Sequence, residues 1–323
     1  MTTDTTEAKN GPEWAHGFFI ALRLLVVLFA FKLFGQDTSK EGWVMFMIIV
    51  AGGVLFPLAR PLQQLRPNHL IEAQQWMMTQ GLLFALLPRP GNESAYIAGC
   101  WLLWCGLMAG EALWKHLKSP LKDAGNLCVT AAGVFPMVGA AWLVAHRANW
   151  TPWGFDPLIV LLTAAHFHHA GFTLPLMAGL NAKARPGCWT RFSCVAILLG
   201  VPFVAAGITC THFGVLPFVE PFGVTILVIG ALGVAVSQIE RGFERERSGL
   251  TRAAFVISGV SLLAAMLLAM SFGLRYLFPQ LALTMPQMWM IHGTLNAFGF
   301  GLCGILAWRG AGRVPHSTKP CCA

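Results

Sequence analysis

Residues 224–247 read VTILVIGALGVAVSQIERGFERER, and this stretch decides the fold class. No charged residue occurs from Val224 to Ile239, and alternating glutamates and arginines follow at once. The apolar run begins upstream, near Leu216. Because a hydrocarbon core of ~30 Å requires about 20 apolar residues in a helix, residues 216–239 predict a transmembrane helix. The charged segment after it predicts a helix end in water.

The composition of the whole chain agrees with this prediction. Of the 323 residues, 56% are hydrophobic and 11% are charged, against roughly 45–50% and about 25% in soluble domains. A soluble chain with so little charge could not cover its surface, whereas a bilayer solvates apolar side chains. The sequence therefore predicts an all-α, polytopic transmembrane helical bundle in one domain, with no signal peptide before it.

About ten apolar segments repeat this pattern along the chain. The third is the weakest, because Gln74, Gln75 and Gln80 interrupt it. The domain organisation follows: a cytoplasmic tail over 1–14, the helical bundle over 15–309, and a second cytoplasmic tail over 310–323. The predicted spans are 15–35, 43–59, 71–88, 95–114, 126–146, 156–180, 190–212, 216–239, 251–273 and 286–308.

Basic residues test this span count independently, because they should gather on the cytoplasmic side. Alternate connecting segments are rich in Lys and Arg, for example Lys115, Lys118, Lys122, Lys183, Arg185, Arg191, Arg241, Arg245, Arg247 and Arg252. The opposite segments hold only Lys40, Arg89, Arg147 and Arg275. The alternation predicts that both termini are cytoplasmic. It also explains the net charge of +8 without a nucleic-acid partner, since no continuous basic face is formed.

The nine cysteines are scattered, and none forms a CxxC pair. This usage predicts neither a disulfide framework nor a zinc site. The adjacent Cys321 and Cys322 follow a basic tail, which makes them candidates for palmitoylation.

The sharpest polar cluster lies in the sixth span, where residues 163–175 read TAAHFHHAGFTLP. At 100° per residue, Thr163, His166, His169 and Thr173 share one face, while His168 points nearly the other way. Polar side chains inside a membrane normally face the bundle interior. Pro175 removes a backbone donor, so we expect the helix to kink or unwind near that turn.

A second cluster lies in the tenth span, where His292 and Asn296 share a face at i,i+4. Gly293, Ala297 and Gly301 form a ridge of small residues that permits a close neighbouring helix. Counted from the outer helix ends, the two clusters lie at comparable depth. We therefore expect them to meet in the outer half of the bundle.

Three further polar residues are weaker candidates, and a fourth has a simple local explanation. Glu220 and His212 lie at the outer ends of their spans, and Gln80 lies deeper in the third. Glu111 lies one turn before Lys115, a spacing that predicts a local ion pair. A lone membrane histidine is usually a packed imidazole bonded to the next helix; clustering on two spans is what favours a functional site.

The runs TAAHFHHAGF (163–172) and HGTLNAFGF (292–300) resemble the signatures of the YndJ-like family of bacterial membrane proteins. The resemblance is strong over these two helices and rests on the span pattern elsewhere. It implies a shared polar site and a bacterial inner-membrane location, and it assigns no particular chemistry. In the family pattern the position of His169 is often aromatic, so a histidine there departs from the pattern.

Our first functional hypothesis is an enzyme that performs acid–base chemistry on a lipophilic small molecule. Imidazoles exchange protons near neutral pH, and an amide can hold a substrate oxygen. Motifs for hydrolysis, phosphoryl transfer and di-iron oxidation are absent from the sequence, which leaves cyclisation, isomerisation or hydration. The catalytic candidates are His166, His169, His292, Asn296 and Glu220. The substrate-binding candidates are Thr163, His168, Thr173, His212 and Gln80.

Two alternatives from other classes stay open. The polar sixth span suits a small-molecule or proton-coupled transporter. His166, His169 and His292 could instead hold a metal or a haem, although few carboxylates are available to support such ligands. No cofactor is predicted. The expected partners are the lipid bilayer and a lipophilic substrate, and the oligomeric state is left open.

Overall fold

A computed structural model describes residues 13–38, 40–63, 69–119 and 123–312. These residues form helices joined by short connections, and no strand occurs among them. The helical elements are α1 (Glu13–Phe34), α2 (Glu41–Val50), η1 (Ala51–Leu55), α3 (Phe56–Ala59), η2 (Arg60–Gln63), α4 (His69–Leu86), α5 (Asn92–Lys118), α6 (Ala124–Arg147), η3 (Pro152–Gly154), α7 (Pro157–Ala184), α8 (Cys188–His212), α9 (Val219–Gly242), α10 (Gly249–Gly273), η4 (Pro279–Leu281), α11 (Met285–Gln287), η5 (Met288–His292), η6 (Leu295–Leu302) and α12 (Cys303–Gly310). The predicted all-helical class is confirmed.

Eight stretches of the described residues are long and apolar enough to cross a membrane. Seven are α2 to η2 taken together, α5, α6, α7, α8, α9 and α10; the eighth runs from Met285 to Gly310. The helices α1 and α4 occupy the other two predicted spans. In α4 the glutamines lower the hydropathy, and α1 carries Arg23, whose guanidinium donates to the Glu72 backbone carbonyl of α4 at 3.3 Å. The multi-pass membrane protein predicted from composition is thus supported, while the side on which each terminus lies stays a prediction.

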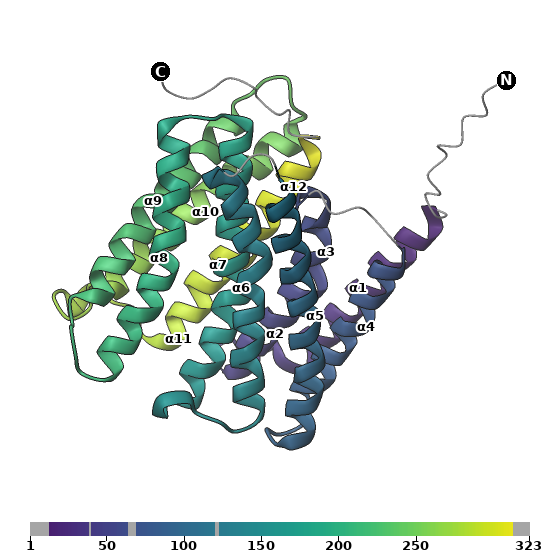
Figure 1. The fold of residues 1–323 in the computed structure, drawn as a ribbon, viewed down its shortest axis with the longest axis vertical. Coiled ribbons are helices and arrows are strands. Elements are labelled where there is room, and N and C mark those ends of the chain that lie inside the picture. The colour runs from purple at the N-terminus through teal and green to yellow at the C-terminus, as the bar shows by residue number, and fades with distance from the viewer. Residues whose placement is uncertain (1–12, 39, 64–68, 120–122, 313–323) are drawn as a thin grey trace.

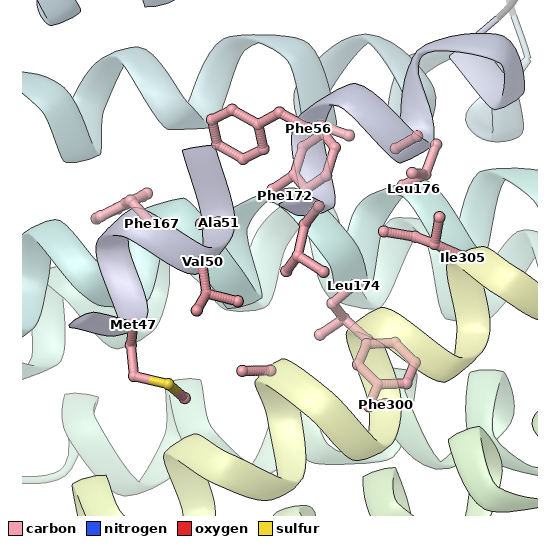
Figure 2. Close-up of a cluster of buried hydrophobic side chains, with 14 of the residues drawn as sticks. Met47, Val50, Ala51, Phe56, Phe167, Phe172, Leu174, Leu176, Phe300 and Ile305 are labelled. Atoms are coloured by element: carbon pink, nitrogen blue, oxygen red, sulfur yellow. The ribbon is translucent and has the colours of Figure 1, made fainter. Parts of the chain in front are cut away.

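The long helix α7 occupies the centre of the bundle, as Figure 1 shows. It packs against α2, α6, α8, α9 and η6. From Gly171 to Asn181 every side of the helix is buried. Figure 2 shows the apolar core that results, with Phe172 of α7 against Phe56 and Leu174 of α7 near Phe300 of the last span.

Of the kink or unwinding expected at Pro175, the unwinding does not occur, because α7 remains helical from Pro157 to Ala184. Wider π-helical turns occur instead in two neighbouring spans, at η1 and at η5 and η6. A π-helical turn inserts one extra residue per turn and is frequent at functional sites. In this bundle η1 and η6 contact each other and α7, so the irregular backbone lies beside the polar helix.

The local ion pair predicted from the spacing of Glu111 and Lys115 is confirmed. Its charged atoms lie 3.6 Å apart. Arg60 from η2 joins the same carboxylate at 3.3 Å, so the pair also links two spans.

Candidate functional site

The helix that carries three histidines begins at a defined point. The Asp156 side chain accepts a hydrogen bond from the Leu158 backbone N–H at 2.8 Å, and Pro157 is the first helical residue. Both features are typical of helix N-termini. The start of α7 therefore fixes the depth at which His166, His168 and His169 lie.

His168 is a fully buried member of the core between α7, α5 and α3. Its Nδ1–H donates to the Ala164 carbonyl at 2.7 Å, and its Nε2 accepts from the Trp101 indole N–H at 2.8 Å. The imidazole stacks on the Phe56 and Trp101 rings, with centroids 5.9 and 6.0 Å away. With both nitrogens bonded, His168 has no nitrogen left for a ligand, and this geometry favours a structural role. The predicted difference in direction between His168 and its neighbours is present.

His169 faces the second span. Its Nε2–H donates to the Met47 backbone carbonyl of α2 at 2.7 Å. A carbonyl only accepts, so Nε2 carries the hydrogen and Nδ1 carries the lone pair. The side chain is 6% exposed, and Nδ1 finds no partner among the described residues. An unpaired buried acceptor costs free energy, so this nitrogen is a strong candidate for a ligand contact.

His292 and Asn296 form a bonded pair in the last span. His292 Nδ1–H donates to the Ala265 carbonyl of α10 at 2.9 Å. The Asn296 amide nitrogen donates to His292 Nε2 at 3.1 Å and to the His292 carbonyl at 2.9 Å. The two residues share a face as the i,i+4 spacing predicts, and the pair holds the His292 ring in one orientation.

His166 differs from the other three imidazoles. It lies close to His169 and His292, so the clusters on the sixth and tenth spans meet as expected. Its side chain is exposed, and it makes no hydrogen bond to any residue that the structure describes. We call His166, His169, His292 and Asn296 the histidine cluster. Within this cluster, His166 is the imidazole whose two nitrogens both lack a hydrogen-bond partner among the described residues.

The surroundings of His166 are accessible on one side only. On α7, Ile159, Leu162, Thr163 and Ala170 are partly exposed and share the face of His166. One turn further on, Thr173 is fully buried. The accessible face of α7 therefore covers its predicted outer half and ends near the middle of the bundle.

Close packing of α7 against η6 closes this face. A Cβ added at Gly301 would lie 3.1 Å from Thr173 Cγ2 and 3.0 Å from the Asn296 carbonyl oxygen. Only a glycine permits this approach without displacing a neighbour. Of the predicted ridge of small residues, Ala297 and Gly301 are buried, whereas a Cβ at Gly293 would meet nothing within 4 Å.

Glu220 and His212 are bonded to neighbouring segments. The Glu220 carboxylate accepts from Arg275 at 2.6 and 3.2 Å and from the Thr211 hydroxyl at 2.6 Å. Burial acts to lower the pKa of Arg275, but the hydrogen bonds and charge of Glu220 outweigh it and raise that pKa. Both oxygens of the Glu220 carboxylate are therefore already bonded within the protein, to a bidentate arginine and a hydroxyl.

His212 and the remaining candidates make local contacts. His212 is exposed, stacks on Phe155 at 4.2 Å, and contacts the Trp153 carbonyl through Nε2 at 3.0 Å. The Thr163 and Thr173 hydroxyls donate to the Ile159 and His169 carbonyls, both at 2.8 Å.

The glutamine that the sequence singled out is not the buried one in α4. Gln80 is partly exposed, whereas Gln75 is fully buried with both amide atoms unpaired among the described residues. The prediction ranked Gln80 by its depth along the helix. The direction in which each side chain points was decided by packing.

Sequence reasoning missed the part played by the second span. The Met47 carbonyl orients His169, and the stacked ring of Phe56 orients His168. The one signal in the sequence was the pair Gly52-Gly53 followed by Pro57, which is unusual inside an apolar run. These residues coincide with the π-helical turn η1 and the start of α3.

Metal ligation finds no geometric support in the described part of the chain. No group of three or more His, Cys, Asp or Glu side chains there is arranged to hold a metal ion. The hypothesis of a metal or haem at His166, His169 and His292 therefore rests on residue types alone.

Comparison with known proteins gives one family and one relative. Residues 44–300 match the family model described as YndJ-like protein. Over 222 residues the chain is 30% identical to the protein named "Uncharacterized membrane protein YndJ" of Bacillus subtilis (strain 168). That stretch covers 66% of this chain and 38% of the relative, so the chain spans well under half the relative's length. No solved structure matches.

Proposed function

The chain belongs to the YndJ-like protein family, and from its histidine cluster we propose that it is a membrane-embedded enzyme of acid–base chemistry. The substrate is a lipophilic small molecule that reaches the accessible face of α7. The reaction class is cyclisation, isomerisation or hydration. The bacterial inner membrane is the proposed location.

One observation carries the proposal: an accessible imidazole with no protein partner in the described chain lies beside two imidazoles held by backbone carbonyls. His166 is the accessible ring, and the carbonyls of Met47 and Ala265 hold His169 and His292. A catalytic acid or base must be able to reach the substrate, and the groups around it must be held in place. His166 meets the first requirement, and the two bonded imidazoles meet the second. A ring that served only to pack the core would be bonded and buried, as His168 is.

The proposed roles follow from which nitrogens are free. His166 removes a proton from the substrate and returns it to another substrate atom, so an isomerisation or cyclisation needs no co-reactant. His169 offers its Nδ1 lone pair as a second acceptor. The pair of His292 and Asn296 orients the substrate. Because like charges repel in an apolar setting, the cluster is suited to carry one proton at a time.

Deuterium incorporation tests this function while the substrate is still unidentified. Protein in lipid nanodiscs is incubated with a bacterial lipid extract in D₂O, and the extract is then analysed by mass spectrometry. We expect a lipophilic species to gain about 1 Da per returned proton, because His166 exchanges its proton with solvent. The His166→Ala variant should abolish the gain, and His116→Ala, a histidine in the last turn of α5 outside the cluster, should retain it. Equal incorporation by wild type and His166→Ala contradicts the proposal.

A transporter is the second candidate, and the one-sided accessibility of α7 favours it. The accessible face ends at Ala170, and the contact between Thr173 and Gly301 closes the bundle beyond it. A carrier open to one side has this form. Recovery of chemically unchanged substrate on the far side of sealed vesicles would support the carrier and refute the enzyme.

A further inference from the structure

A cavity of about 420 Å³ lies at the opposite end of the bundle from the accessible face of α7, where α7, α9 and α12 end. The loop between α9 and α10 forms one wall. Sequence alone predicts only a solvated helix end of mixed charge for this loop. We call the cavity the arginine pocket. Its charged lining comprises Arg185, Arg241, Arg245, Arg247, Glu244 and Glu246.

Guanidinium donors outnumber acceptors in the arginine pocket. The Glu244 carboxylate is shared by Arg185 at 2.6 Å, Arg247 at 2.5 Å and Arg241 at 3.7 Å. Each guanidinium carries about five N–H donors, whereas a carboxylate accepts about four hydrogen bonds. Arg245 is exposed and has no ion pair among the described residues. Glu240 also accepts from Arg185, at 3.4 Å, yet the four guanidiniums still carry more N–H donors than the carboxylates around them accept.

One wall of the pocket is buried and holds a further unpaired donor. Arg241 is 3% exposed, donates from Nε to Asn181 Oδ1 at 3.1 Å, and lies over the Trp308 ring at 4.6 Å. Trp308 is 1% exposed and lines the pocket, and its indole N–H has no partner in the described chain. An unpaired buried donor is costly, and an anion oxygen bound in the pocket would satisfy the Trp308 N–H.

We propose that the arginine pocket binds a phosphate group, carried either by an anionic lipid or by a soluble phosphate compound. Arginine pairs with phosphate through two parallel hydrogen bonds, and its planar head suits a partly buried site. The positive-inside rule and the partial negative charge of helix C-termini also attract arginine. Those two effects require charge near the helix ends, but they require neither a cavity nor a buried tryptophan N–H that has no partner among the described residues.

The experiment compares two sources of phosphate on the full chain. In detergent, unfolding is followed with and without inorganic phosphate, with chloride matching the ionic strength. In nanodiscs, phosphatidylglycerol is compared with phosphatidylcholine, and native mass spectrometry counts the lipids retained. Stabilisation by inorganic phosphate supports a soluble ligand, and selective retention of phosphatidylglycerol supports a lipid.

Two variants link either response to the pocket. Arg245→Gln and Arg185→Gln each remove one guanidinium from an exposed side chain, and we expect each to weaken binding by about tenfold, the usual loss for one charged hydrogen bond. Arg191→Gln, an exposed arginine outside the pocket, should leave binding unchanged. Absence of both responses overturns the proposal, as does an equal loss in Arg191→Gln.

Discussion

Replacement of His168 by alanine separates a structural histidine from a functional one. The change removes two hydrogen bonds, to Ala164 and Trp101, and it empties a fully buried site between two aromatic rings. Truncation of a buried aromatic side chain costs ~3–5 kcal/mol. The Trp101 N–H that is left without an acceptor costs about 1–3 kcal/mol, and part of this cost is already contained in the first value. Because these losses overlap, we expect His168→Ala to lower the free energy of unfolding by about 4 kcal/mol.

The matched variant is His166→Ala, two residues away on the same helix. His166 is exposed and unbonded within the described chain, so its removal should change the free energy of unfolding by no more than about 0.5 kcal/mol. The assay is denaturant unfolding of purified protein in mixed micelles, followed by tryptophan fluorescence. If the two variants unfold at the same denaturant concentration, the assignment of His168 to the core and of His166 to the site is refuted.

Three further predictions concern topology, the outer ion pair and the helix contact. Reporter fusions at Lys183 should signal cytoplasm and fusions at Pro152 periplasm; exchanged signals would overturn the span count. Glu220→Gln leaves Arg275 without its counter-charge, and we expect the free energy of unfolding to fall by about 2 kcal/mol. This loss is smaller than the ~3–5 kcal/mol of a fully buried pair, because Arg275 is partly exposed. A wild-type free energy of unfolding would contradict the prediction. Gly301→Val introduces a Cβ 3.1 Å from α7 and should cost about 1–3 kcal/mol by overpacking, whereas the same change at Gly293, where a Cβ meets open space, should be nearly neutral.

Much of the histidine cluster could be predicted from helical geometry. The period of 3.6 residues places His166 and His169 on one face and His168 on another, and it pairs His292 with Asn296. Counting residues along each helix from its outer end then places the two polar clusters at the same depth in the bundle. Both steps need only a continuous helix, and α7 is helical from Pro157 to Ala184.

The partners of these side chains could not be predicted in the same way. Glu220 is a catalytic candidate from the sequence, yet its carboxylate is bonded to Arg275, which comes 55 residues later. The Met47 carbonyl that orients His169 lies 122 residues away in sequence. A backbone carbonyl has no signature in the sequence, because every residue has one.

The sequence by itself determined that this protein lies in a lipid bilayer, where its helices approximately begin and end, and on which helix faces its polar residues lie. These properties depend on local composition and on the helical period. A bilayer enforces helices, because its hydrocarbon core offers no hydrogen-bond partner to an unpaired backbone group. Tertiary structure decided which imidazole nitrogens stay free. That outcome depends on the neighbour that packs against each ring: the Trp101 indole occupies His168, the Ala265 carbonyl holds His292, and the accessible face of α7 leaves His166 unbonded within the described chain.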